Sequence, residues 1–192
     1  MKNGFAPYET KARCEPSRFR SGFTLIEMLV SIFIIGVLSA ALLLNYRSGQ
    51  NEAFLTRAAA VFETDLRGAQ NLAISSRESN GLVPCGYGLH YVDNRRYSIY
   101  AGQRSGASSC QTSNQNYQSG LDSVYEENQI IESAVIFKTS WPDIFFEPPD
   151  PSVYINKIKL VGTSATIQFC LENDLTKCRN LTVDTAGRIA TQ

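Results

Sequence analysis

The chain has 192 residues and a mass of 21.3 kDa, which suits one ordinary domain with an appendage. A hydrophobic content of 43% is enough for a packed core and excludes wholesale disorder. Eighteen Lys and Arg residues balance eighteen Asp and Glu residues, so the total charge points to no class of partner.

The charge is unevenly distributed along the chain. Residues 1–22 hold five basic side chains and two acidic ones, and they precede the only long apolar run, residues 23–44. A basic flank before a hydrophobic span predicts a cytoplasmic N-terminus and a remainder that crosses the membrane. From residue 23 onward thirteen basic residues face sixteen acidic ones, so this part of the chain is slightly acidic.

The apolar run of residues 23–44 is a candidate membrane helix. A helix of this length spans about 33 Å, against a hydrocarbon core of about 30 Å. A secretory signal would have a shorter apolar region ending in a small-residue cleavage site, whereas here apolar residues continue past the small residues 39–41. Glu27 lies inside the span at a cost of roughly 3 kcal/mol, so the carboxylate either reaches the membrane surface or has a partner.

The residues around Glu27 show a resemblance to a known family. The stretch Ser21-Gly22-Phe23-Thr24-Leu25-Ile26-Glu27 resembles the class III signal of type IV prepilins, in which a basic leader ends in Gly, Phe usually follows, and Glu is fifth after the cut. The resemblance implies that a prepilin peptidase cleaves between Gly22 and Phe23 and methylates the new N-terminus of Phe23. It also implies that Glu27 acts in filament assembly, as the counter-charge to the amine of a neighbouring subunit.

A second, amphipathic helical segment follows the span. Residues 51–75 carry apolar side chains near helical spacing, and no Pro interrupts residues 23–76. We expect one continuous helix with a membrane half and a half that packs on a globular domain. The apolar residues of this stripe are Phe54, Ala58, Val61, Phe62, Ala69, Leu72 and Ala73.

Beyond residue 76 the pattern becomes that of strands. Residues 87, 89 and 91 alternate with Gly88 and His90, and residues 97, 99 and 101 alternate with Ser98 and Tyr100. The Asp-Asn turn between the two stretches predicts a β-hairpin. The polar residues 102–122 are expected to form an exposed loop. Further strands are predicted at residues 130–138, 144–147, 153–161, 165–171, 181–184 and 188–190. Short, turn-separated strands indicate an antiparallel sheet domain.

Four cysteines lie beyond the span, and Cys14 lies before it. An even set in a translocated domain predicts two disulfides, for which three connectivities exist. We favour sequential pairing, because each sequential pair brackets a polar, turn-rich stretch. Zinc is the rival interpretation, but there is no CxxC pair. The favoured pairs are Cys85 with Cys110 and Cys170 with Cys178.

The sequence offers little catalytic chemistry. His90 is the only histidine, and its position within a predicted strand is typical of an ordinary strand residue. There is no P-loop, dinucleotide fingerprint or HExxH motif. Asp143, Glu147 and Asp150 surround a Pro-rich turn and are interpreted as solvated turn residues instead of calcium ligands. We therefore predict no enzyme, no cofactor and no metal site.

The ectodomain also resembles a subgroup of the family. The segments Gly86-Tyr87-Gly88-Leu89, Ile167-Gln168-Phe169 and Val183-Asp184-Thr185-Ala186-Gly187-Arg188-Ile189 are similar to H-type minor pseudopilins of type II secretion and to FimT-like minor pilins. This implies an α+β, pilin-like fold, with a long N-terminal helix packed on an antiparallel sheet. The expected divisions are a cytoplasmic leader (1–22), a membrane or filament-core helix (23–44), its amphipathic continuation (45–76) and a periplasmic β domain (77–192).

The function implied by the resemblance is that of a minor pseudopilin of a type II secretion pseudopilus, which polymerises from the bacterial inner membrane to drive protein export. The alternative is a minor pilin of a type IV pilus. The expected partners are a prepilin peptidase, other pilins or pseudopilins, the inner membrane and its assembly platform. Some FimT-like pilins bind DNA through a Gly-Arg-x-Arg pattern, which makes Arg188 a candidate nucleic-acid contact. The second Arg of that pattern is missing here.

Overall fold

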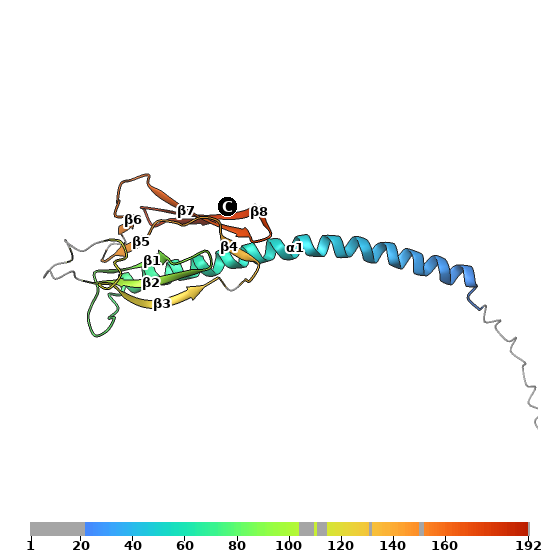
Figure 1. Cartoon of the computed structure of the whole chain (residues 1–192), viewed down its shortest axis with the longest axis horizontal. Coiled ribbons are helices and arrows are strands. Elements are labelled where there is room, and N and C mark those ends of the chain that lie inside the picture. Colours follow the sequence, from blue (N-terminus) through green and yellow to red (C-terminus); the bar gives the residue numbers. More distant parts are fainter. Residues whose placement is uncertain (1–21, 104–109, 111–114, 131, 150–151, 192) are drawn as a thin grey trace, which may run out of the picture. The chain divides into compact units, whose positions relative to one another are not determined.

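The computed structural model describes residues 22–103, 110, 115–130, 132–149 and 152–191, without the side chains of residues 43–48. These residues form one helix, α1 (Leu25–Ile74), followed by the strands (Figure 1). The strands are β1 (Gly86–Tyr91), β2 (Arg96–Gly102), β3 (Ser123–Gln129), β4 (Val135–Phe137), β5 (Ile144–Glu147), β6 (Ser152–Ile155), β7 (Ser164–Leu171), β8 (Asp174–Asp184) and β9 (Ile189–Thr191).

The chain divides into two compact units, Met1–Leu44 and Asn45–Gln192. The apolar half of α1 belongs to the first unit, and the amphipathic half belongs to the second unit together with every strand in the described part of the chain. The expected cytoplasmic leader, including Cys14, lies outside the described residues except for Gly22.

The strands of the second unit form two antiparallel sheets. The five-stranded sheet has the order β3-β2-β1-β5-β6, and the four-stranded sheet has the order β4-β7-β8-β9. The predicted hairpin is β1–β2, in register from Gly86 opposite Gly102 to Tyr91 opposite Tyr97. The α+β fold class is confirmed, although the strands divide between two sheets.

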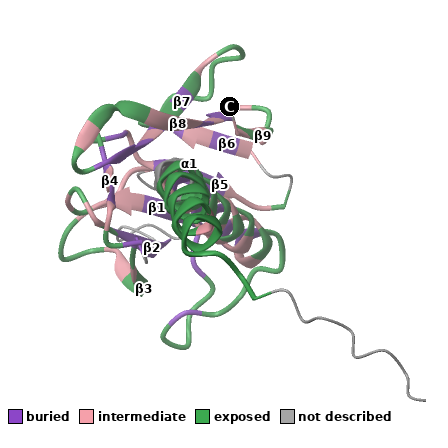
Figure 2. Ribbon diagram, turned by 90° about the vertical axis from the view of Figure 1, so that its right-hand side faces the viewer, coloured by how far each residue is buried: buried purple, intermediate pink, exposed green. Residues whose placement is uncertain are grey.

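The amphipathic half of α1 lies between the two sheets, as Figure 2 shows. Its Phe62 is almost completely buried and meets rings from both sheets. The ring centroid of Phe62 lies 4.9 Å from that of Tyr97 on β2 and 5.5 Å from that of Phe169 on β7. Apolar side chains with an i, i+3/i+4 spacing place one stripe of the helix in this core. The buried stripe consists of Leu55, Ala58, Ala59, Phe62, Leu66, Ala69 and Ala73.

One strand lies where the sequence indicated none. Strand β3 follows directly after the predicted loop, and four of its seven residues in succession, Val124 to Glu127, are exposed. A strand exposed on both faces has no alternation of apolar and polar residues, so periodicity does not reveal it. It forms because its backbone pairs with β2 at the edge of the sheet.

Three predicted strands have different limits in the structure. Only residues 135–137 of the stretch 130–138 form a strand, β4. Strand β6 ends at Ile155 instead of residue 161, because Asn156 and Lys157 adopt positive φ angles of 49° and 68° and turn the chain. Strand β8 begins seven residues before the predicted position 181, since it pairs with β7 along its length.

Both disulfides in the structure follow the sequential pairing. Cys85 is bonded to Cys110, which ties the residue before β1 to the long polar loop. Cys170 is bonded to Cys178, and these two residues are direct cross-strand neighbours in the β7–β8 pair.

Candidate functional site

The candidate site is the start of α1, where the sequence pattern is most specific. Gly22, Phe23 and Thr24 precede the helix, and Leu25 is its first residue. The Thr24 hydroxyl accepts a hydrogen bond from the Glu27 backbone N–H at 3.3 Å. This contact satisfies one of the backbone donors that a helix N-terminus leaves without a partner. Thr24 is therefore the N-cap, and it keeps the Gly22–Phe23 peptide outside the helix.

The N-cap is a residue whose role the sequence analysis missed. Thr24-Leu25-Ile26-Glu27 fits the S/T-x-x-E capping box, a pattern that marks helix starts. Glu27 lies in the first turn, where the positive end of the helix dipole favours a carboxylate. The same carboxylate that is costly within an apolar span is thus placed where the backbone partly offsets its charge.

The Gly22–Phe23 junction is open to solvent. The Phe23 side chain is 70% exposed, and a Cβ added at Gly22 would meet no heavy atom within 4 Å. A peptide bond in this position is accessible to a protease without unfolding of the helix that follows.

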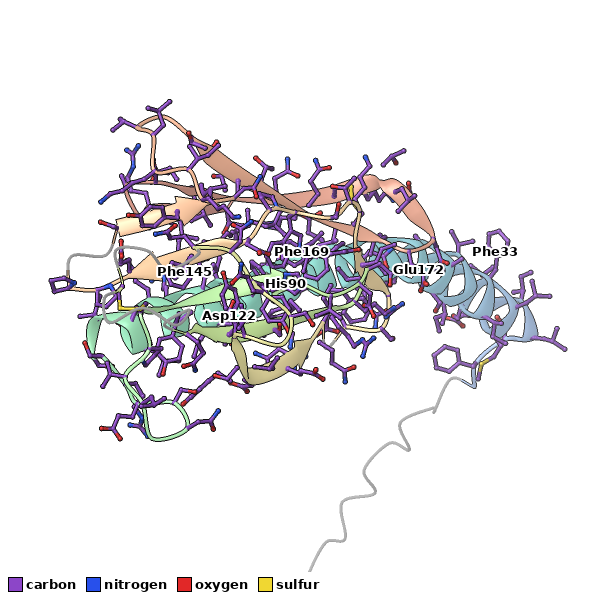
Figure 3. The ribbon with its side chains drawn as sticks, turned by 60° about the vertical axis from the view of Figure 1, so that its left-hand side comes forward. Phe33, His90, Asp122, Phe145, Phe169 and Glu172 are labelled. Carbon is purple, nitrogen blue, oxygen red and sulfur yellow. A yellow bond between two sulfur atoms is a disulfide. The ribbon has the colours of Figure 1, made fainter. Side chains whose placement is uncertain are left out.

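The helix that begins here is apolar on all sides. Residues Leu25–Leu42 have a mean hydropathy of 2.5 and are long and apolar enough to cross a membrane, and none of them is buried in the chain itself. Phe33 projects outward from α1 in Figure 3 and is 68% exposed. Glu27 is the only charged residue in this segment, and its carboxylate has no cationic partner among the described residues. A helix with this all-round apolar surface requires lipid or other helices around it.

The single histidine lies in a polar contact that the sequence did not indicate. The His90 Nδ1 atom is 2.8 Å from Asp143 Oδ1, and Asp143 Oδ2 accepts a hydrogen bond of 2.8 Å from the Tyr117 backbone N–H. The His90 ring also stacks on Tyr117, with the ring centroids 4.3 Å apart. His90 therefore fastens the end of the long polar loop to β1.

This contact also uses a carboxylate from the acidic cluster near the Pro-rich turn. Asp143 is engaged by His90 and Tyr117, and Asp150 lies outside the described residues. Within the described ranges, no group of three or more His, Cys, Asp or Glu residues is arranged to hold a metal ion.

The sequence of the N-terminal segment matches a family model. Residues 17–43 match the model described as the prokaryotic N-terminal methylation motif. The matched residues include the exposed Gly22–Phe23 junction, the Thr24 cap and Glu27.

Comparisons of the whole chain give weaker likenesses. Two crystal forms of the type IV minor pilin FimU from Pseudomonas aeruginosa are similar in structure, each at 16% sequence identity over 72% of this chain. They cover 87% and 92% of the FimU chains, with TM-scores of 0.47 and 0.45. Comparison with curated proteins found no match.

Several basic residues in the described part of the chain are paired with carboxylates. The Arg188 side chain is 84% exposed, and its Nε atom is 2.8 Å from Asp184 Oδ2. Four other described basic residues also lie within 4.0 Å of a carboxylate, two of them at 2.6–2.7 Å and two at 3.8 Å, and phosphate would have to compete with these partners. The pairs are Arg95 with Glu172, Arg96 with Asp93, Lys177 with Asp174 and Arg179 with Glu52.

Proposed function

We propose that this protein is a subunit of a filament of the type IV pilin class, anchored in the bacterial inner membrane by the apolar half of α1, with the β domain in the periplasm. The observation that carries the proposal is an exposed Gly22–Phe23 junction directly before a capped, apolar helix whose single charge is Glu27. The basic leader supports a cytoplasmic N-terminus.

Cleavage at this junction changes the electrostatics of the helix start. It leaves an α-amine on Phe23, close to the apolar phase, where an unpaired charge is costly. The Glu27 carboxylate of a neighbouring subunit offers the opposite charge when the helix moves from lipid into a filament core. Pairing of the amine with Glu27 would fix the axial position of one subunit against the next. We therefore assign Gly22 and Phe23 to processing, Phe23 to N-methylation, and Glu27 to assembly.

Two substitutions separate processing from assembly. Gly22→Val places a branched side chain at the cut, and we expect the leader to remain, seen as an unprocessed N-terminus by mass spectrometry. Glu27→Gln keeps the size of the side chain but removes its charge. We expect normal cleavage and membrane insertion of this variant, and loss of the chain from sheared filaments. Ser39→Ala, within the same apolar segment, is the matched control and is expected to behave as the parent.

A Glu27→Gln chain that enters filaments at the parental level would contradict the assembly role. A chain whose N-terminus is Met1 in the parent strain would contradict the whole proposal, because no prepilin-type processing would then occur.

The finer proposal is a minor pseudopilin of a type II secretion pseudopilus, with a minor pilin of a type IV pilus as the alternative. The ectodomain segments resemble both subgroups, which supports these two candidate functions. Quantitative proteomics of the sheared-surface and supernatant fractions from a deletion strain and its parent separates them. Loss of soluble exported proteins with unchanged pilin is expected for the pseudopilin. Loss of surface pilin with unchanged exported proteins would instead make the chain a pilus subunit.

A further inference from the structure

The first turn of α1 has two possible acceptors for one backbone donor. In the structure the Glu27 N–H donates to the Thr24 hydroxyl at 3.3 Å, and the Met28 N–H donates to the Thr24 carbonyl at 3.2 Å. If the helix began one residue earlier, the Glu27 N–H would instead bond the carbonyl of Phe23, because an α-helix pairs each N–H with the carbonyl four residues before it. The Thr24 hydroxyl therefore competes with an extension of the helix toward the leader.

Loss of this hydroxyl would favour the longer helix. The helix begins at the edge of the apolar segment Leu25–Leu42, where an amide without a partner costs more free energy than it does in water. The carbonyl of Phe23 would then be the nearest acceptor for the Glu27 N–H. A side-chain cap typically shifts such an equilibrium about fivefold. Gly22 disfavours a helix, so the extension would be partial.

The extension would change the state of the peptide between Gly22 and Phe23. Its carbonyl belongs to Gly22, and in the longer helix that oxygen would accept a hydrogen bond from the Ile26 N–H. A peptide inside the helical ladder has its carbonyl engaged and its faces covered by the neighbouring turns. In the structure neither Gly22 nor Phe23 is helical, and the junction is open to solvent. Cleavage requires this open form.

We infer that Thr24 is a positioning residue for removal of the leader. Its hydroxyl fixes the start of α1 and thereby keeps the Gly22–Phe23 peptide in the non-helical form that a peptidase can bind. This inference rests on the proposed processing at Gly22 and names a residue that controls its rate. Thr24 acts through the backbone of α1. It uses the N–H of Glu27 and leaves the carboxylate free for the assembly role proposed above.

The test is the rate of leader removal from full-length chains, incubated in membranes with a prepilin peptidase and followed by mass spectrometry. Thr24→Val keeps the branched shape without the hydroxyl, and we expect it to slow cleavage at least about threefold. Thr24→Ser keeps the hydroxyl and should be cleaved at the parental rate. Ser31→Ala is the matched control, because it removes a hydroxyl that donates to the Glu27 carbonyl at 2.7 Å and caps no helix. Its rate should also be parental.

A proline distinguishes positioning from a direct contact between the hydroxyl and the peptidase. Leu25 is the first residue of α1, where proline is favoured, and proline also disfavours a helical conformation for the residue before it. Leu25→Pro therefore fixes the helix start without the hydroxyl. In the Leu25→Pro background, Thr24→Val is expected to change the cleavage rate less than about 1.5-fold. This comparison holds whatever Leu25→Pro does by itself.

Rates are compared for chains that stay in the membrane after alkaline carbonate extraction, so a failure to insert is not counted as slow cleavage. Parental cleavage of Thr24→Val would overturn the inference and leave the proposed processing intact. An equal slowing by Thr24→Val with and without Leu25→Pro would also overturn it, because the hydroxyl would then act by direct contact. A parent chain that is never cleaved would contradict the proposed processing itself, and the inference with it.

Discussion

At the scale of single residues, two tyrosines of β2 differ in the hydrogen bonding of their hydroxyl groups. The Tyr97 hydroxyl donates a 2.5 Å hydrogen bond to Asp65 on α1, and Asn128 donates to the same oxygen at 3.1 Å. Burial and the Asp65 contact raise the pKa of Tyr97. The Tyr100 hydroxyl is buried without a hydrogen-bond partner among the described residues. Burial is also the main reason that its pKa is raised.

Removal of each hydroxyl should therefore have a different effect. Tyr97→Phe is expected to lower the free energy of unfolding by roughly 1.5–3 kcal/mol, the usual range for a hydrogen bond to a charged group. Tyr100→Phe is expected to leave it unchanged or to raise it by up to about 1 kcal/mol, since the buried hydroxyl gains no bond. Urea unfolding followed by the fluorescence of Trp141, the only tryptophan, measures both. Equal losses from the two substitutions would contradict this account.

In the turn before β9, one carboxyl group makes the stability of the fold depend on pH. Asp184 accepts hydrogen bonds from the backbone N–H groups of Ala186 and Arg188, at 3.0 Å and 2.9 Å, and from the Arg188 side chain. The backbone bond from Arg188 is the largest cause that lowers the pKa of Asp184. The unfolded chain thus binds this proton more tightly than the folded chain does.

The stability that Asp184 contributes is fully present above its unfolded pKa of about 3.9, and it is lost as the pH falls through the lower folded value. The difference between the urea midpoints of the parent and Asp184→Asn is therefore expected to be constant above about pH 5. It should shrink at pH values below about 4. A difference that stays constant down to pH 2 would show that ionisation of Asp184 does not stabilise the fold.

At the scale of elements, the amphipathic half of α1 joins the two sheets. Phe62 contacts Tyr97 of the five-stranded sheet and both Phe137 and Phe169 of the four-stranded sheet, besides Trp141. The sequence periodicity placed Phe62 on the apolar face of the helix but did not single out Leu55, Ala59 and Leu66, which are also buried. The predicted apolar stripe therefore lies on the buried side of α1. The buried face is wider than this stripe because both sheets pack against it.

The contribution of Phe62 to the free energy of unfolding can be measured directly. Phe62→Ala is expected to lower the free energy of unfolding by about 3–5 kcal/mol, because it removes a buried ring and leaves a cavity between the sheets. The exposed neighbour Thr64→Ala should change it by less than about 0.5 kcal/mol. Urea unfolding monitored by circular dichroism provides the comparison. A loss below about 1 kcal/mol for Phe62→Ala would mean that the sheets hold together without the helix.

At the scale of the whole molecule, the two disulfides close loops of different length. Cys85–Cys110 spans 25 residues in sequence, whereas Cys170–Cys178 spans 8 residues and links strands that already pair. In the chain-entropy model, a longer loop restricts the unfolded chain more strongly. The bond that ties the long polar loop to the sheet should therefore stabilise the β domain more.

Replacement of each cysteine pair by serine tests this order. The expected losses in the free energy of unfolding are roughly 3.5 kcal/mol for Cys85–Cys110 and roughly 2.5 kcal/mol for Cys170–Cys178. Thermal unfolding of the two double variants, compared with the parent under identical conditions, gives the ranking. If the short-loop variant is the less stable one, packing around the buried Cys170 outweighs chain entropy.

The start of α1 and its apolar segment could be predicted because they depend on residues that are adjacent in the sequence. The length and hydropathy of residues 23–44, the Gly22–Phe23 junction and Glu27 are properties of adjacent residues, and the Thr24 cap follows from the same short motif. The hairpin β1–β2 was predictable for the same reason, since its turn joins neighbouring strands.

Tertiary structure decided the features that depend on residues distant in sequence. Strand β3 exists because β2 pairs with it, and β8 is long because β7 is present along its whole length. Gly88 is required because a Cβ there would lie 2.6 Å from the ring of Tyr100, a fully buried side chain. The sequence by itself thus determined the helix, its N-terminal methylation motif and its apolar face, whereas long-range pairing and packing decided the sheets.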